Sequence, residues 1–150
     1  MAVLTTLADA VTAELNATSR TWSGRFSAER MNVPILKREQ AKYISGIVTP
    51  ISRTTTKLNR GVIQDVCVLQ IGIQQTLQDG DNDETDVLIA LGEEIQAYFD
   101  QGLGLAAMPA ASCEDTSFGA NDENPWLSVR DIEGLMLYTG VIGLTFRVMR

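Results

Sequence analysis

The stretch GVIQDVCVLQIGIQQTL, residues 61–77, decides the expected fold. It is long enough for a β-strand that crosses a whole sheet, and Asp65 is its one charged residue. Successive side chains of a strand point to opposite faces, so the face that holds Cys67 and Leu69 is apolar and predicts core. The other face mixes valines with three glutamines. These are Gln64, Gln70 and Gln74.

The glutamine-bearing face has two explanations that the sequence leaves open. Interfaces accept neutral polar residues more readily than charges, so this face fits a surface that is wetted in the monomer and covered in an assembly. It equally fits the solvent-facing side of an antiparallel sheet.

Two amphipathic helices are expected on either side of this strand in the sequence. Apolar residues recur at spacings of three and four over residues 3–17 and again over residues 84–100. The carboxylates that precede the second helix suit a helix N-terminus electrostatically. Both helices should pack on a sheet.

Further strands are predicted from alternating apolar and polar residues over 25–31, 43–49 and 137–149, with Pro50 closing the second of them. Residues 52–61, SRTTTKLNRG, are expected to form a long exposed hairpin loop, and residues 101–129 an extended surface segment. The fold class is therefore α+β: a mixed or antiparallel four-stranded sheet with two helices packed on it and long connecting loops, in a single domain over residues 1–150.

The cysteines and the N-terminal residues limit the possible classes of protein. Cys67 and Cys113 lie outside any CxxC spacing and are expected to be unpaired thiols. The N-terminal stretch fits neither a signal peptide nor a membrane span, because acids interrupt it and no cation precedes it. The mature chain is expected to start near Met1.

No catalytic, cofactor-binding or metal-binding residues emerge from the sequence. The chain has no histidine, which excludes Ser-His-Asp triads and removes the commonest metal ligand. The segment DGDNDETD, residues 79–86, fails the EF-hand register, and Gly102-Leu103-Gly104 follows a helix, the wrong context for dinucleotide binding. Glu93 and Asp100 are the remaining acid/base candidates, without a positioned partner. We expect a protein that is not an enzyme and needs no cofactor.

Charge is strongly separated along the chain. Residues 20–60 hold nine lysines and arginines against two acids, a net charge of +7, whereas residues 79–133 hold fourteen acids against Arg130, a net charge of −13. The two regions are either ordinary solvated faces or complementary surfaces of neighbouring copies, which would give heterologous contacts that can close into a ring. The overall charge of −7 argues against a duplex-binding protein.

Candidate interface residues follow from this separation. The positive candidates are Arg53, Lys57 and Arg60, and the negative candidates are Asp79, Asp81 and Asp83. Gln64, Gln70 and Gln74 would supply a neutral polar surface between them.

The order of these features resembles the neck-region tail terminator and minor capsid proteins of long-tailed bacteriophages and prophages. The resemblance is carried by LADAVTAELNA, FSAERMNVP, YISGIVTPISR, DVCVLQIGIQQTL, DVLIALGEEIQAYF and GVIGLTFRV. These segments match in hydrophobicity and order rather than in catalytic signatures. The acidic segment 101–129 has no matching motif.

The resemblance implies a structural virion protein that forms a homo-oligomeric ring, a hexamer in that family, capping the tail tube and offering the surface that joins the head. Its implied partners are the tail tube protein and the head–tail connector or stopper proteins, with DNA crossing the lumen without sequence-specific binding and with no membrane involved. It implies a place in the virion, in the tail or neck, after assembly in the host cytoplasm. Another head–tail connector or head-completion protein is the nearest alternative. A small acidic adaptor that binds a basic protein is the alternative from a different class.

Overall fold

The computed structural model describes residues 2–17, 22, 26–32, 44–76, 82–102, 104–118 and 137–150. The elements follow in the order α1 (Val3–Asn16), β1 (Phe26–Arg30), β2 (Ile44–Asn59), β3 (Val62–Thr76), α2 (Asn82–Asp100), β4 (Gly104–Leu105), β5 (Met108–Phe118) and β6 (Leu137–Met149). The predicted helices and the predicted strands over residues 25–31 and 137–149 are confirmed to within two residues at each end.

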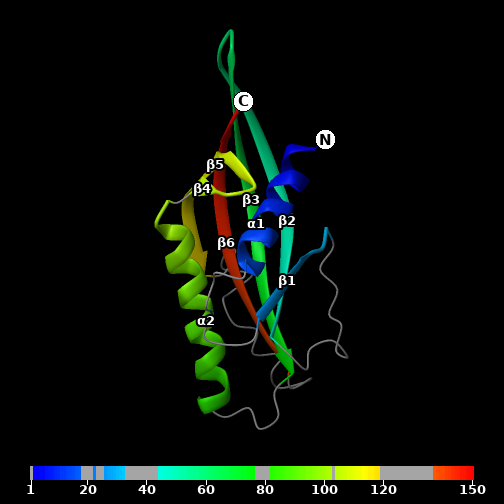
Figure 1. Ribbon diagram of the computed structural model, residues 1–150, viewed down its shortest axis with the longest axis vertical. Coiled ribbons are helices and arrows are strands. Elements are labelled where there is room, and N and C mark those ends of the chain that lie inside the picture. The colour runs from blue at the N-terminus through cyan, green and yellow to red at the C-terminus, as the bar shows by residue number, and fades with distance from the viewer. Residues whose placement is uncertain are drawn as a thin grey trace.

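A single curled sheet, shaped like half a barrel, organises the described residues (Figure 1). Its strand order is β1-β2-β3-β6-β5-β4. β1 pairs with β2 in parallel, and all other neighbours are antiparallel. The last strand in the sequence, β6, therefore lies in the middle of the sheet between β3 and β5.

The expected fold class, a four-stranded α+β sheet with two helices packed on it, is wrong. The sheet has six strands and the structure is mostly β. The two additional strands, β4 and β5, fall inside residues 101–129, where we expected an extended surface segment. β5 has a weak sequence signal because its residues are small and polar, and its pairing with β6 holds it in the sheet.

The expected loop at residues 52–61 is also wrong, because β2 continues through Pro50 as far as Asn59. β1 pairs with β2 only as far as Val48. Pro50 lies beyond that point, on an edge that no described strand covers, so its missing N–H breaks no hydrogen-bond ladder there. Only Arg60 and Gly61 remain as the turn between β2 and β3.

The core forms between the helices and one face of the sheet. Both helices bury their apolar stripes against this face, and the fully buried side chains include Leu69 and Ile71 of β3 and Phe146 of β6. The Phe146 ring meets the Phe99 ring of α2 edge-on, at 6.1 Å between centroids. The predicted apolar face of residues 61–77 is thereby confirmed as core.

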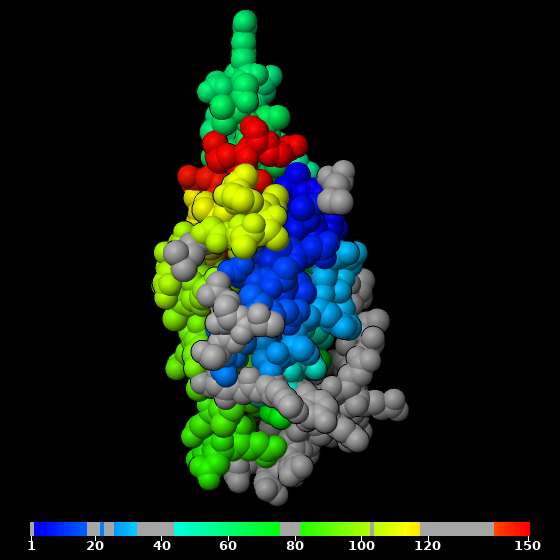
Figure 2. All heavy atoms as spheres, viewed as in Figure 1, coloured from blue at the N-terminus to red at the C-terminus, as the bar shows by residue number. Residues whose placement is uncertain are grey.

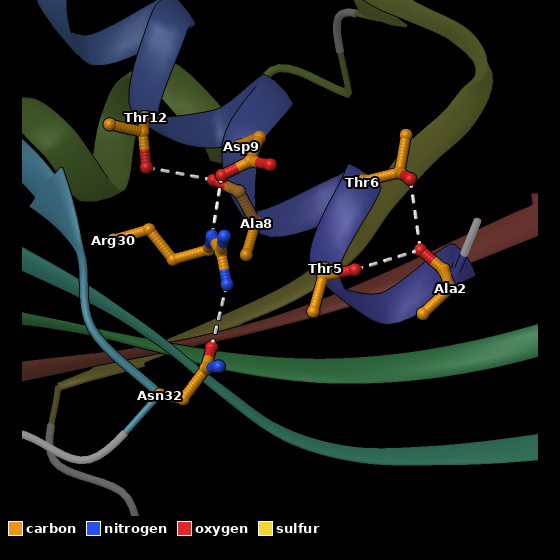
Figure 3. Close-up of polar contacts among 8 residues, drawn as sticks. All are labelled: Ala2, Thr5, Thr6, Ala8, Asp9, Thr12, Arg30 and Asn32. Carbon is orange, nitrogen blue, oxygen red and sulfur yellow. Dashed lines mark hydrogen bonds and ion pairs between the residues drawn. The ribbon is translucent and has the colours of Figure 1, made fainter.

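Polar contacts fix α1 to β1 (Figure 3). Arg30 of β1 donates from Nε to Asp9 Oδ1 at 2.5 Å and from Nη1 to Asn32 Oδ1 at 2.8 Å. Asn16, at the end of α1, exchanges two hydrogen bonds of 2.8 Å with the backbone of Ala28. The helix therefore has a fixed position over the edge of the sheet, although its N-cap residue, Ala2, offers no side-chain cap.

Candidate functional site

The most prominent feature of the described surface is an arm, residues 51–65, formed by the end of β2, the turn and the start of β3. Figure 1 shows the arm projecting beyond the helices at one end of the long axis, and Figure 2 shows its tip standing clear of the body. Every residue from Ile51 to Gly61 is exposed. These residues include three cations and no acid. An exposed arm with one sign of charge is suited to contact another molecule.

A buried carboxylate anchors the arm at its base. Asp65 of β3 is fully buried, and its two oxygens accept hydrogen bonds from side chains of the neighbouring strand β2. Thr55 Oγ1 lies 2.6 Å and Arg53 Nε 3.1 Å from Oδ1, and Arg53 Nη2 lies 3.3 Å from Oδ2. Arg150, which directly follows β6, adds Nε at 2.7 Å from Oδ2. One carboxylate thus ties together three adjacent strands.

The charge state of Asp65 follows from these contacts. Burial alone would raise the pKa of Asp65, but the hydrogen bonds from Thr55 and Arg53 and the positive charges of Arg150 and Arg53 outweigh it, so the pKa lies below its ordinary value of 3.8. The cover over the carboxylate is thin, because the Arg53 and Arg150 side chains are 32% and 40% exposed. The anchor is therefore ionised at neutral pH and lies close to the surface.

The positive candidates all lie on the arm, but they differ in what they contact. Lys57 and Arg60 are exposed near the tip. Arg53 is already bound to Asp65 within the chain. Its guanidinium is thus committed to the arm's own anchor, while Lys57 and Arg60 point their charge toward solvent at the far end.

The negative candidates and the glutamines lie elsewhere. Asp83 is exposed in the first turn of α2, whereas Asp79 and Asp81 lie outside the described residues. The glutamines lie on the face of β3 opposite to the core face. On it, Gln64 and Gln70 are half-buried and Gln74 is buried at 8% exposure. The structure therefore brings the glutamines together on one strand and separates the basic tip from Asp83 along the long axis.

The exposed side of α2 is a second charged surface. The buried stripe of this helix contains Leu88, Leu91, Ile95 and Phe99. On the opposite side the exposed residues recur at helical spacing, with Val87 among acids. The exposed acids of α2 are Asp83, Asp86, Glu93 and Asp100. No lysine or arginine occurs between residues 82 and 100, so this face is uniformly negative.

Sequence reasoning missed the anchor and the apolar part of the arm. It placed Asp65 on the core face of its strand, and a lone carboxylate on an apolar face is a signal that a cation must face it. The identity of the cations depended on strand register, which the sequence did not show. Leu58, at 52% exposure, is the apolar residue of the tip, and it lay in a segment interpreted as a loop.

Other kinds of site find no support among the described residues. These residues contain no group of side chains suited to hold a metal ion. Within the same ranges, neither helix is long and apolar enough to cross a membrane. Both cysteines are free, as expected; burial raises the pKa of Cys67 and raises that of Cys113 to about 11.

Comparison of the chain with models of known protein families gives no match, and comparison with curated protein sequences gives no significant match either. The arm, the charge distribution and the order of elements are therefore the features of the chain that bear on its function.

Proposed function

We propose that this protein is a structural component of a phage neck, a tail-terminator-like subunit that assembles into a homo-oligomeric ring on the tail tube and presents the surface that joins the head. The role is non-enzymatic and needs no cofactor. Its partners would be further copies of the chain, the tail tube protein and the connector or stopper proteins, with DNA passing through the lumen. Its place would be the virion, after assembly in the host cytoplasm.

One observation carries the proposal: the basic tip of the arm and the acidic start of α2 lie at opposite ends of the same subunit (Figure 1). Unlike surfaces at opposite ends suit a heterologous, head-to-tail assembly in which each copy contacts a different neighbour at each end, whereas an antiparallel two-fold dimer would pair both ends with one neighbour and is separated from a ring by its mass. Such an assembly forms a closed ring when the rotation between copies permits. The resemblance in element order to tail terminators agrees with a ring.

The native mass of the purified protein tests this proposal. We expect a discrete oligomer of several subunits by native mass spectrometry, an annular outline by negative-stain microscopy, and binding to purified tail tubes at one end. A protein that stays monomeric at every concentration and does not bind tails would contradict the proposed function.

A second candidate is an acidic adaptor that binds a basic protein, and the uniformly negative face of α2 favours it. An adaptor would remain monomeric or dimeric and would not bind tail tubes. The same mass measurement therefore separates the two candidates.

A further inference from the structure

We infer that the tip of the arm of one copy docks on the exposed acidic face of α2 in a second copy. The inference rests on the proposed ring and specifies its subunit contact. It differs from the charge pairing expected from the sequence, because it places the contact on a helix face and gives it an apolar centre.

The arm tip combines an apolar residue with flanking cations. Leu58 is 52% exposed and lies between Lys57 and Arg60 in the sequence. The β2–β3 pairing skips it, because Lys57 pairs with Ile63 and Asn59 with Val62. Leu58 is therefore an extra residue at the end of the hairpin, where an apolar side chain gains nothing from the subunit's own core.

The face of α2 has the complementary pattern. Val87 is 44% exposed and is preceded by the exposed acids Asp83 and Asp86, of which Asp83 lies one helical turn before it. Asp83 and Asp86 stand three residues apart with no cation in the helix, and like charges at this spacing destabilise a helix slightly. A docked cation would relieve this repulsion, and Leu58 would cover Val87. An apolar centre with a charged rim is the usual composition of a protein interface.

This contact cannot form within one subunit. The arm projects at one end of the long axis and α2 begins at the other end (Figure 1). The two surfaces must therefore belong to different copies, and in the proposed ring each copy offers its arm to one neighbour and its α2 face to the other.

Charge also decides against the obvious alternative, two arms pairing edge to edge. Beyond Val48, no described strand covers the outer edge of β2, so two such edges have free backbone groups. A two-fold pairing of these edges would bring together the like charges of Lys57 from each copy. Lysine on an exposed edge strand is a known obstacle to such pairing.

Cross-linking between two single-cysteine variants tests the contact. Leu58→Cys and Val87→Cys are purified separately, mixed, and treated with a bis-maleimide. We expect a cross-linked dimer in the mixture and none in either variant alone; wild type controls for the native thiols, of which Cys67 is buried. Cross-linking of Leu58→Cys with itself would mean that arms pair edge to edge, and would overturn the inference. No cross-link in protein that assembles would overturn it as well.

Charge reversal gives an independent test. Lys57→Glu with Arg60→Glu should raise the subunit dissociation constant at least about tenfold, and Asp83→Lys with Asp86→Lys should recover part of it. Glu29→Lys, an exposed reversal on β1, is the matched control and should recover nothing. Equal recovery by the control would refute the specific contact. If wild type forms no oligomer at all, the proposed function fails; if it forms a ring that these reversals leave intact, only this contact fails.

Discussion

Replacing the buried carboxylate, Asp65→Asn, tests whether the arm is held by a charged anchor. The substitution keeps the shape of the side chain and one acceptor oxygen, but it removes the negative charge and places an amide donor against arginine donors. We expect the free energy of unfolding at pH 7 to fall, and the arm to lose its fixed position on the body.

The magnitude follows from the contacts of Asp65. Hydrogen bonds to a charged group contribute about 1.5–3 kcal/mol each, and Asn leaves about two of them unmade. Breaking a deeply buried ion pair costs about 3–5 kcal/mol because the partner charge stays buried. Here the partners are 32% and 40% exposed and can turn to water, which lowers the cost. We therefore expect a loss of about 2–3 kcal/mol.

The pH dependence distinguishes loss of the charge from loss of packing. The pKa of folded Asp65 lies below its ordinary value of 3.8, so its ionisation stabilises the fold above that pH and the contribution disappears as pH falls through the folded pKa. Wild type and Asp65→Asn should therefore differ by the full amount at pH 7, and the difference should shrink as the pH falls below 3.8 towards the lower pKa of the folded carboxylate.

Urea unfolding at pH 7 and at pH 3 measures both the loss in free energy of unfolding and its dependence on pH. Asp115→Asn, the same change at an exposed position of β5, is the control and should stay within about 0.5 kcal/mol of wild type. A loss at Asp65 that is equal at both pH values, or no larger than the control's, would show that the anchor does not act through its charge.

Three further outcomes are expected from the fold. Phe146→Ala should lower the free energy of unfolding by about 3–5 kcal/mol, since the ring is fully buried; an unchanged denaturation midpoint would contradict the assigned strand face. Gly46→Ala should cost about 1–3 kcal/mol, because the Phe26 ring occupies the position of the new Cβ, and a Phe26→Ala background should remove most of that cost. Cys113, with its pKa raised to about 11 from 9.0, should react with iodoacetamide at pH 8 about a hundredfold more slowly than a free thiol, and a rate equal to that of the unfolded protein would refute its burial.

The elements that the sequence predicts are those whose own residues show a clear periodicity of apolar side chains. The faces of β3 follow from strict alternation around Cys67 and Leu69, and both helices follow from apolar residues at spacings of three and four. β5 could not be found in this way. Its buried residues, such as Ala111, are small, and a register shift after Cys113 breaks the alternation.

The candidate site was predictable in its charges and not in its geometry. Lys57 and Arg60 were identified from composition alone. The anchor required the register of β2 against β3 and of β6 against β3, which places Thr55 opposite Asp65 and brings Arg150 beside it. Strand register depends on the whole sheet, so the local sequence around Asp65 does not predict which residues contact it.

The central position of β6 determines when the sheet can form. β2 and β3 are joined by a two-residue turn, so this hairpin can form early from local contacts. β5 has β4 as a local partner, but these two strands join the rest of the sheet only through β6. The half of the sheet beyond β3 must therefore wait until residues 137–149 have been synthesised, and pairings of such high contact order make folding slow, in the range of milliseconds to seconds. During that interval the edge of β3 that pairs with β6 is open, and unpaired strand edges of this kind are prone to aggregation until the chain is complete.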